Sequence, residues 1–369
     1  HLSVVLSSGK ALLPPLELEP HEKLESIRQQ VEAQLCGQPF SLLLSSGELL
    51  SDWEKSVEES GIVEFDHLTV VLKPVQKLIC VPEAADSILV YNTATGEVSN
   101  VDVTGIAAGE GKWCGAELVE GKIYAVPEDA DQMLVYDTVT GDISGVDVST
   151  VATGTSKWSA STAVGDLVCG LPMDCDVMLI YNTRTREMSG VDTSAVATGS
   201  YKWGSAVAVN GAVYGIPANC DTMLVYQIAT GSLLGIDISR LSTGEFKWGS
   251  SLAVDDVIYG IPEHSDAMLV YNTKLGELSS INTTTVGVGS FKWGHAVAVE
   301  STIYAVPKCH PSILACHTKT GKVSGIPIPN AVEGQDDMEE IIMRWDAAAL
   351  IEGRILAVPV DAGAMLVYS

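Results

Sequence analysis

Residues 202–238 read KWGSAVAVNGAVYGIPANCDTMLVYQIATGSLLGIDI and contain one unit of the repeat that decides the fold. The unit holds four short apolar segments: 204–209, 212–217, 223–228 and 233–238. Asn210–Gly211 is a typical two-residue hairpin turn, and Thr230–Gly231 marks a second turn. Short apolar segments separated by turns predict four antiparallel strands in each unit.

A basic residue followed by tryptophan marks each copy of the unit. The pair returns every 45 residues, and after 52 residues in the last copy. The six pairs are Lys112 and Trp113, Lys157 and Trp158, Lys202 and Trp203, Lys247 and Trp248, Lys292 and Trp293, and Arg344 and Trp345. A proline that closes the second segment has the same spacing: Pro82, Pro127, Pro172, Pro217, Pro262, Pro307 and Pro359.

Four short strands repeated at this interval are typical of the blades of a β-propeller. The coils of a β-solenoid are usually much shorter, which disfavours that alternative. The first strand of each unit is rich in Ala, Gly and Ser, so we expect it to lie innermost, where strands converge. The second and third strands occur seven times, and the first and fourth six times. Residues 77–369 therefore predict seven blades, of which the first and last each lack one strand. Six complete blades are the alternative and leave a redundant pair of strands.

The repeated Lys-Trp pairs allow two interpretations. They can form a ring of cations and aromatic rings for a ligand, or the tryptophans can wedge between blades while the lysines pair with loop aspartates. In five repeats an aspartate follows the proline by four residues: Asp86, Asp131, Asp176, Asp221 and Asp266. In an up-and-down blade both loops lie on the same face. The sequence therefore favours a structural ring of exposed ion pairs, each of which would contribute only ~0–1 kcal/mol.

The pattern resembles kelch-type propellers in strand order and in its "IY…LVY-T-TG" sequence. It lacks the Gly-Gly pair of kelch blades and the Trp-Asp ending of WD40 blades. It is more similar to "KW…NG-IYGIP…D…LV-D-TG" repeat proteins of algae and other protists. That resemblance implies the fold and no activity.

The first 73 residues predict a separate domain of order ββαββ, with an amphipathic helix within residues 20–37. This order resembles the ubiquitin β-grasp. Lys73–Pro74 stands where ubiquitin has its free Gly-Gly tail, so the resemblance implies docking or support and not conjugation. The domain either caps the propeller or binds a partner through a sheet face near Leu44, Thr69 and Val71.

Charge and composition limit the partners. The chain has a formal charge of −26, which disfavours nucleic acid and anionic membranes. No long uninterrupted apolar stretch predicts membrane insertion. The eight cysteines are scattered, which favours reduced thiols in a reducing compartment. That compartment is the cytoplasm or, after removal of a targeting peptide, a plastid or another organelle.

No motif of catalysis or of cofactor binding stands out, so the sequence predicts a non-enzyme without a cofactor. Cys309, His310, Cys316 and His317 suggest zinc by their proximity. Because Cys316 aligns with Tyr226 on a predicted strand, and strand neighbours point to opposite faces, packing is the favoured interpretation.

The insertion before Trp345 breaks the repeat and is strongly acidic. Five acids lie within eight residues: Glu333, Asp336, Asp337, Glu339 and Glu340. It is either a solvated loop or a docking element for a basic protein surface. The function predicted first is that of a scaffold or subunit that binds an unidentified protein partner. The alternatives are an adaptor of the ubiquitin system and a small-ligand-binding or hydrolytic propeller.

Overall fold

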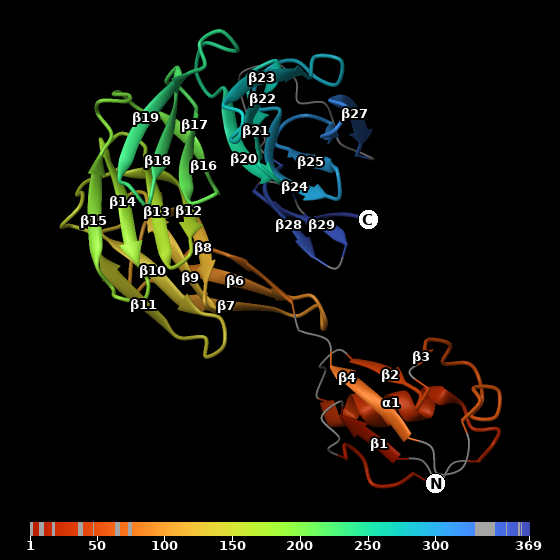
Figure 1. Cartoon of the computed structure of the whole chain (residues 1–369). Coiled ribbons are helices and arrows are strands. Elements are labelled where there is room, and N and C mark those ends of the chain that lie inside the picture. Colours follow the sequence, from red (N-terminus) through yellow and green to blue (C-terminus); the bar gives the residue numbers. More distant parts are fainter. Residues whose placement is uncertain are drawn as a thin grey trace. The chain divides into compact units, whose positions relative to one another are not determined.

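The computed structural model describes residues 3–6, 11–16, 19–35, 40–46, 48–62, 67–72, 76–328, 344–351, 353–360, 362 and 364–369. These residues form thirty strands and one helix (Figure 1). The chain divides into two compact units. One contains residues 1–79 and 89–99, and the other contains residues 80–88 and 100–369. Within the described residues, no helix is both long enough and apolar enough to cross a membrane.

The N-terminal part of the first unit is a mixed sheet with one helix. The strand order is β1 (Ser3–Leu6), β4 (His67–Leu72), β2 (Phe40–Leu43) and β3 (Leu49–Leu50). β1 is parallel to β4, and the other pairs are antiparallel. The helix α1 (Leu24–Leu35) confirms the predicted helix. The second predicted strand is described only as a single bridge between Val5 and Ala11.

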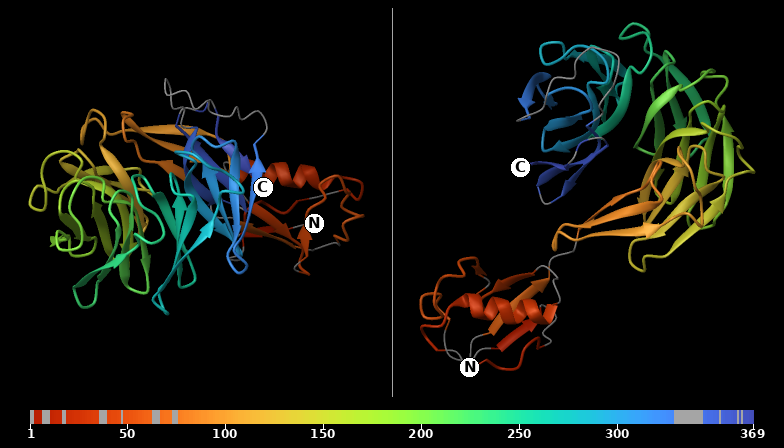
Figure 2. Two further views of the ribbon diagram at one scale, coloured as in Figure 1. Left: turned by 90° about the horizontal axis from the view of Figure 1, so that it is seen from above. Right: turned by 180° about the vertical axis from the view of Figure 1, so that it is seen from behind.

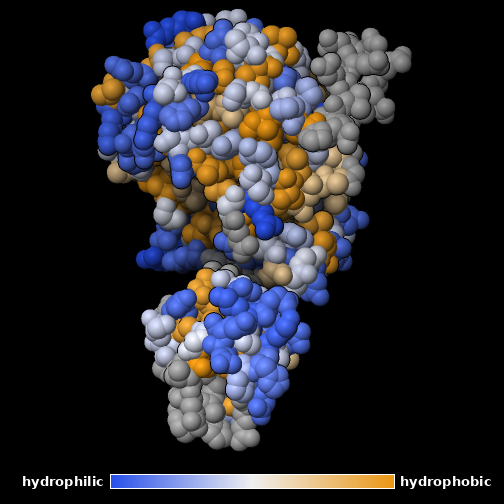
Figure 3. All heavy atoms as spheres, turned by 90° about the vertical axis from the view of Figure 1, so that its right-hand side faces the viewer, coloured by the Kyte–Doolittle hydropathy of each residue, from blue (hydrophilic) through white to orange (hydrophobic). Residues whose placement is uncertain are grey.

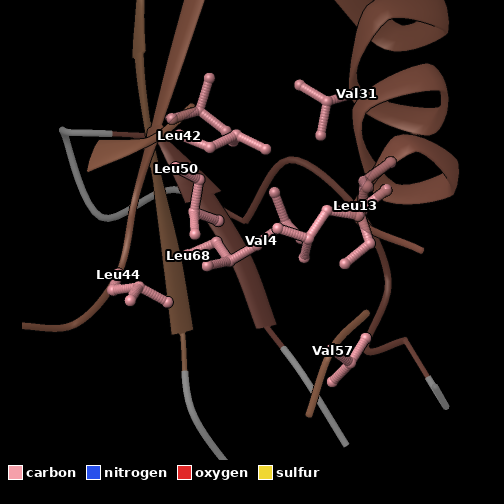
Figure 4. Close-up of a cluster of buried hydrophobic side chains, with 11 residues drawn as sticks. Val4, Leu13, Val31, Leu42, Leu44, Leu50, Val57 and Leu68 are labelled. Atoms are coloured by element: carbon pink, nitrogen blue, oxygen red, sulfur yellow. The ribbon is translucent and has the colours of Figure 1, made fainter. Parts of the chain in front are cut away.

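The helix covers one face of this sheet. Leu24, Ile27 and Val31 recur at helical spacing and are fully buried. They join Leu42 and Leu68 of the sheet in one apolar core (Figure 4). Alternation along the strands places these residues on the inner face, so the two elements share a core that neither could form alone.

The repeat forms five four-stranded sheets. The first is β8 (Trp113–Val119), β9 (Lys122–Pro127), β10 (Gln132–Asp137) and β11 (Ile143–Asp147). The second is β12 (Trp158–Val164), β13 (Leu167–Pro172), β14 (Val177–Asn182) and β15 (Met188–Asp192). The third is β16 (Trp203–Val209), β17 (Ala212–Pro217), β18 (Thr222–Gln227) and β19 (Ser232–Asp237). The fourth is β20 (Trp248–Val254), β21 (Val257–Pro262), β22 (Ala267–Asn272) and β23 (Glu277–Asn282). The fifth is β24 (Trp293–Val299), β25 (Thr302–Pro307), β26 (Ser312–His317) and β27 (Lys322–Pro327).

Two further sheets of the repeat have three described strands. The opening sheet is β5 (Lys77–Cys80), β6 (Ser87–Asn92) and β7 (Val98–Asp102). The final sheet is β28 (Trp345–Ile351), β29 (Arg354–Pro359) and β30 (Leu366–Tyr368). The opening sheet therefore has the second to fourth strands of the unit, and the final sheet has the first to third.

Consecutive sheets from β8–β11 onward stand around a common axis (Figures 1 and 2). The first strands β8, β12, β16, β20, β24 and β28 each contact the next in the series. They lie innermost, as predicted. Small residues allow the close approach, since a Cβ on Gly204 would lie 3.0 Å from the Trp248 carbonyl oxygen.

The opening sheet lacks a first strand because the chain uses that segment elsewhere. Leu68 stands 45 residues before Trp113, where the repeat would place the marker tryptophan. Leu68 belongs to β4, which pairs with β1 and β2, and it is fully buried in the core of the first unit. The segment at this register therefore completes the N-terminal sheet.

Candidate functional site

The six tryptophans of the Lys-Trp pairs are buried structural residues. Their exposed fractions are 9% or less. Each indole N–H donates to a backbone carbonyl nineteen residues later in its own sheet, as from Trp203 to Thr222 at 2.9 Å. Trp158 packs with Tyr124 and Val126 of one sheet and with Leu179 of the next. The rings therefore lie between sheets, and no ligand in solution can reach them.

The five lysines of the pairs are also buried, with at most 1% of each exposed. Their ammonium groups donate mainly to backbone carbonyls. The fullest set belongs to Lys202, which donates to the carbonyl oxygens of Met173, Cys175 and Gly199 at 3.0, 2.9 and 2.9 Å. These carbonyls come from two successive sheets, so the ammonium joins them across the seam. Buried carbonyls need such donors because water cannot reach them.

The predicted pairs of marker lysines with loop aspartates occur at two seams among the described residues, but the lysines are buried and donate mainly to backbone carbonyls. Among the described residues, the loop aspartates lie within 4 Å of an ammonium in two seams. Lys202 lies 3.5 Å from Asp176, and Lys247 lies 3.5 Å from Asp221. Asp86, Asp131 and Asp266 are exposed and form no such pair with a marker lysine. The three donors of an ammonium match the clustered carbonyls better than a single carboxylate does.

Burial shifts the pKa of three of these lysines. It lowers the pKa of Lys157, Lys247 and Lys292, against the opposing effect of nearby aspartates. The pKa of Lys292 falls to about 8. The final marker differs, because the buried Nη1 of Arg344 has no hydrogen-bond partner among the described residues.

The loops that carry the Lys-Trp pairs surround one end of the axis, which we call the mouth. At each seam the marker lysine N–H donates to the carbonyl of the residue that follows the proline in the preceding sheet, as from Lys157 to Glu128 at 3.0 Å. The residues at this post-proline position differ from sheet to sheet: Glu83, Glu128, Met173, Ala218, Glu263, Lys308 and Val360. The same backbone hydrogen bond therefore recurs at every seam of the mouth, while the side chain at the post-proline position changes from sheet to sheet.

A strained non-glycine residue precedes four of the five marker lysines and orients a side chain at the mouth, whereas Gly111 precedes Lys112. Ser156, Tyr201, Phe246 and Phe291 have φ between 48° and 51°, which non-glycine residues rarely adopt. Side-chain oxygens of the preceding sheet accept the N–H groups of the first three residues, as from Tyr201 to Asp174 Oδ1 at 2.9 Å. These bonds hold the left-handed conformation and fix where the side chains point.

Aromatic rings gather on one side of the mouth. The ring centroids of Tyr201 and Phe246 are 5.2 Å apart, and those of Phe246 and Phe291 are 5.9 Å apart. His264 meets Phe291 edge to face at 4.4 Å, and its buried Nε2 has no hydrogen-bond partner among the described residues. Burial, with the Glu263 carboxylate, raises the pKa of the Tyr201 phenol to about 12. Tyr201 therefore remains a neutral hydrogen-bonding group at the mouth.

Carboxylates gather on another side, next to the first complete sheet. Burial raises the pKa of Glu128 to about 7, and the carboxylates of Glu83, Asp129 and Asp174 add to the shift. Like charges in a half-buried place resist ionisation together. This side of the mouth is therefore acidic, and its charge changes near neutral pH.

A partly buried ion triad closes a third side. The Lys308 ammonium lies 3.2 Å from Glu263 Oε1 and 3.1 Å from Asp346 Oδ1. Burial alone would lower the pKa of Lys308, but the two carboxylates raise it. Lys308 and Glu263 occupy the same repeat position in adjacent sheets, so a basic residue in one sheet neutralises an acidic residue in its neighbour.

The predicted partner-binding residues have different outcomes. Glu333, Asp336, Asp337, Glu339 and Glu340 lie outside the described residues, so docking through them stays a prediction. Leu44 is 9% exposed and belongs to the N-terminal core, so its predicted place on a contact surface is wrong. Thr69 is partly buried and alternates with the buried Leu68 and Val70, which places it on the other face of the sheet. Val71 pairs through its backbone with Ser41.

Other candidate sites do not assemble. Within the described part of the chain, no three His, Cys, Asp or Glu side chains converge as metal ligands. Cys316 is fully buried on β26. A pocket of about 320 Å³ lies beside Lys247 and is lined by residues 241–243, 245 and 264–267. His264 thus borders both this pocket and the mouth.

Comparison with known proteins identifies the fold of the repeat. No family model and no curated protein matches the sequence. Among solved structures, the WD40 repeats of RRP9 match 76% of this chain with a TM-score of 0.54 and 9% identity, over 79% of their own length. The repeated sheets form a β-propeller-like fold. A chain of the mitotic checkpoint complex matches with a TM-score of 0.54 and 8% identity, over 80% of this chain and 85% of that one.

A longer protein also matches. The extracellular domain of a hybrid two-component system protein from B. thetaiotaomicron has a TM-score of 0.56 and 11% identity. It covers 79% of this chain, and this chain spans 38% of its length. Identities this low show the fold alone.

The mouth is the feature that our interpretation of the sequence missed. A signal was present in the sequence. The residue after each proline and the residue before each marker lysine differ from repeat to repeat, whereas the proline and the lysine next to them are repeated. Spacing alone could not show that these variable positions meet at one end of the axis. Asp174 and Tyr201, for example, are 27 residues apart in sequence and are joined by a hydrogen bond.

Proposed function

We propose that this chain is a non-catalytic interaction protein that binds a protein partner at the mouth of its propeller. One observation carries the proposal. The repeat keeps the buried tryptophans and lysines that hold the sheets together, and it varies the side chains that surround the mouth. Specific binding requires a surface that differs between repeats, and the mouth is such a surface.

The chemistry of the mouth favours a basic segment of the partner. The acidic side carries Glu83, Glu128, Asp129 and Asp174, and the rings of Tyr201, Phe246 and Phe291 stand on another side. A lysine or arginine can meet carboxylates and aromatic faces at the same time. The overall charge of −26 would also speed the approach of such a partner.

Three of the eight cysteines are poorly suited to covalent catalysis. Burial raises the pKa of Cys169 to about 12 and that of Cys316 to about 11. It also raises the pKa of Cys114, with help from the Glu128 carboxylate. Thiols of this kind stay protonated at neutral pH and are poor nucleophiles.

The finer architecture belongs to the same proposal. Seven repeated sheets support a seven-bladed propeller with kelch-like strand order. The sheet order β1-β4-β2-β3 and the parallel pair β1–β4 support a ubiquitin-like N-terminal domain that docks or supports.

The test is capture of partners from native extract by the tagged full chain. Exchanging Glu83 and Glu128 together for glutamine removes two carboxylates from the mouth with little change of shape. The matched control exchanges Glu120 and Glu300, which lie in the hairpins at the opposite end of the inner strands. We expect the mouth variant to lose the partner and the control to keep it. Equal recovery with both variants contradicts the proposal.

A further inference from the structure

The fourth complete sheet carries a pocket of about 320 Å³ beside Lys247. Two segments at the mouth end of the sheet form it, one within residues 241–247 before β20 and the other residues 264–267 after β21. Apolar residues also reach the surface on the face of the molecule shown in Figure 3, but they carry no charge that would select a partner. The pocket combines shape with charge, and the other sheets show how its shape arises.

The second complete sheet shows how this place is filled elsewhere in the repeat. A Cβ on Gly190 would lie 2.5 Å from Val177 Cγ1 and 3.1 Å from Val151 Cγ1. Val177 begins the third strand β14, and Val151 lies in the loop that precedes the sheet. The two side chains therefore fill the space between that loop and the third strand.

The third complete sheet is filled in the same way, but the fourth is not. A Cβ on Gly235 would lie 2.5 Å from Thr222 Cγ2 and 3.1 Å from Val196 Cγ1. In the fourth sheet Ala267 stands at the position of Thr222. Alanine has no γ-carbon, so the space between its strand and Leu241 of the preceding loop stays open. Ala267 and Leu241 accordingly line the pocket.

The open rim of the pocket is acidic. Glu245 and Asp266 line it, one from each segment, and both are exposed. Lys247 also lines the pocket but is only 1% exposed. Its ammonium donates to the Gly244 carbonyl at 2.8 Å and lies 3.5 Å from the Asp221 carboxylate. The lysine charge is therefore engaged within the seam, and the rim presents two carboxylates to the solvent.

We propose that this pocket binds an arginine side chain of the protein partner. The inference rests on the proposed interaction role and names one residue that the partner must supply. The aliphatic stem of the arginine packs against Leu241 and Ala267. Its guanidinium donates to the carboxylates of Glu245 and Asp266. Arginine fits better than lysine, because its planar fork of five N–H donors can bond two carboxylates at once.

The pocket and the mouth are neighbours, so one segment of the partner can fill both. His264 borders the pocket, and its ring centroid lies 5.3 Å from that of Phe246 and 4.4 Å from that of Phe291 at the mouth. Burial lowers the pKa of His264, and the ammonium groups of Lys292 and Lys308 lower it further. The imidazole is therefore neutral near pH 7 and does not repel a cationic side chain.

The test uses the full chain and two small probes, N-acetyl-arginine amide and N-acetyl-citrulline amide, titrated by ligand-observed NMR. Citrulline keeps the shape of arginine and lacks its charge. We expect saturable binding of the arginine probe, about tenfold tighter than that of the citrulline probe, because the loss of one charge-assisted hydrogen bond weakens binding by about this factor. Equal affinities, or no saturable binding of the arginine probe, would overturn the inference.

One variant closes the pocket with side chains that the repeat already uses. Ala267→Val with Ser280→Gly gives the fourth sheet the pair that Val177 and Gly190 form in the second sheet. The arginine probe should no longer bind, and thermal unfolding checks that the fold is kept. Undiminished binding to a folded variant would show that the probe binds elsewhere and would reject the pocket.

A second variant removes the charges instead of the space. Glu245→Gln with Asp266→Asn should weaken binding of the arginine probe about tenfold and leave the citrulline probe unchanged. The matched control is Glu110→Gln with Asp131→Asn, at the equivalent positions of the first complete sheet, where the Gln132 side chain occupies the corresponding place. This control should bind the arginine probe as the unmodified chain does. The same loss in both variants would mean that general charge attracts the probe, and the inference would fail.

The mouth variant separates this inference from the proposed function. Glu83→Gln with Glu128→Gln should bind the arginine probe normally, since neither residue lines the pocket. Normal binding of the probe together with undiminished recovery of the partner would reject the mouth and keep the pocket. Loss of the partner from the mouth variant, with no binding of the probe to the unmodified chain, would reject the pocket alone.

Discussion

Replacing Lys202 by methionine should destabilise the propeller far more than the same change at Lys157. Both lysines precede a marker tryptophan, and each is at most 1% exposed. Methionine has a similar length and no charge, so the costs of burying the ammonium and of ordering the side chain are nearly the same at both sites. The difference between the two variants therefore reports on the hydrogen bonds that each ammonium makes.

The structure gives the size of that difference. Lys202 donates to three carbonyls, whereas the hydrogen bond described for Lys157 goes to the Gly154 carbonyl alone, at 2.7 Å. A hydrogen bond to a charged group contributes about 1.5 kcal/mol or more, so two additional bonds amount to about 3 kcal/mol. The Asp176 carboxylate at 3.5 Å is half exposed and adds at most about 1 kcal/mol.

The measurement is equilibrium unfolding in urea, monitored by tryptophan fluorescence. The free energies of unfolding are compared for variants whose dependence on urea concentration has the same slope. We expect Lys202→Met to lower the free energy of unfolding by about 3 kcal/mol more than Lys157→Met does. If the two variants lose the same stability within about 0.5 kcal/mol, the carbonyl contacts do not explain why lysine stands at this position.

Three further predictions concern the same sheets. Glu128→Gln should stabilise the chain at pH 8 by up to about 2 kcal/mol and have no effect near pH 4.5. The folded chain favours the protonated form of Glu128, and the stability that this form gives is lost as pH rises through about 7. Thermal unfolding between pH 4.5 and pH 8 checks the sign. Between pH 8 and 10.5 the unmodified chain should gain stability relative to Lys292→Met, because the folded state releases the Lys292 proton at about pH 8 while the unfolded state keeps it. Urea unfolding of both chains measures this, and a difference in free energy of unfolding that does not change with pH would contradict it. Gly190→Ala should cost about 1–3 kcal/mol through its clash with Val177, and Val177→Ala in the same chain should restore most of the loss in thermal unfolding.

The repeat unit could be predicted from the sequence because strand and turn signals are local. Asn210–Gly211 and the alternating segments around it specify a hairpin without reference to the rest of the chain. The marker tryptophans could be assigned to the seams because the same bulky residue at every repeat implies the same repeated environment. The structure confirms both features, with β16 paired to β17 through that turn and with Trp203 fully buried.

The partners of the marker lysines could not be predicted. A loop aspartate was the natural candidate, because side chains are visible in a sequence and carbonyl oxygens are present at every residue. The Lys202 ammonium meets carbonyls of Met173 and Cys175, which precede it by 29 and 27 residues, and the packing of two sheets decides that encounter. The burial of Leu44 likewise depends on where the helix packs on the N-terminal sheet.

Local spacing of apolar residues and turns was enough to specify the strands and their order within each unit of the repeat. Only the tertiary structure decided which variable side chains meet at the mouth, as Lys308 meets Glu263 and Asp346 at separations of 45 and 38 residues. It also decided that residues 67–72 complete the N-terminal sheet instead of the opening sheet of the repeat. An apolar strand carries the same local signal in either sheet, and the difference lies in the core that buries Leu68 and Val70.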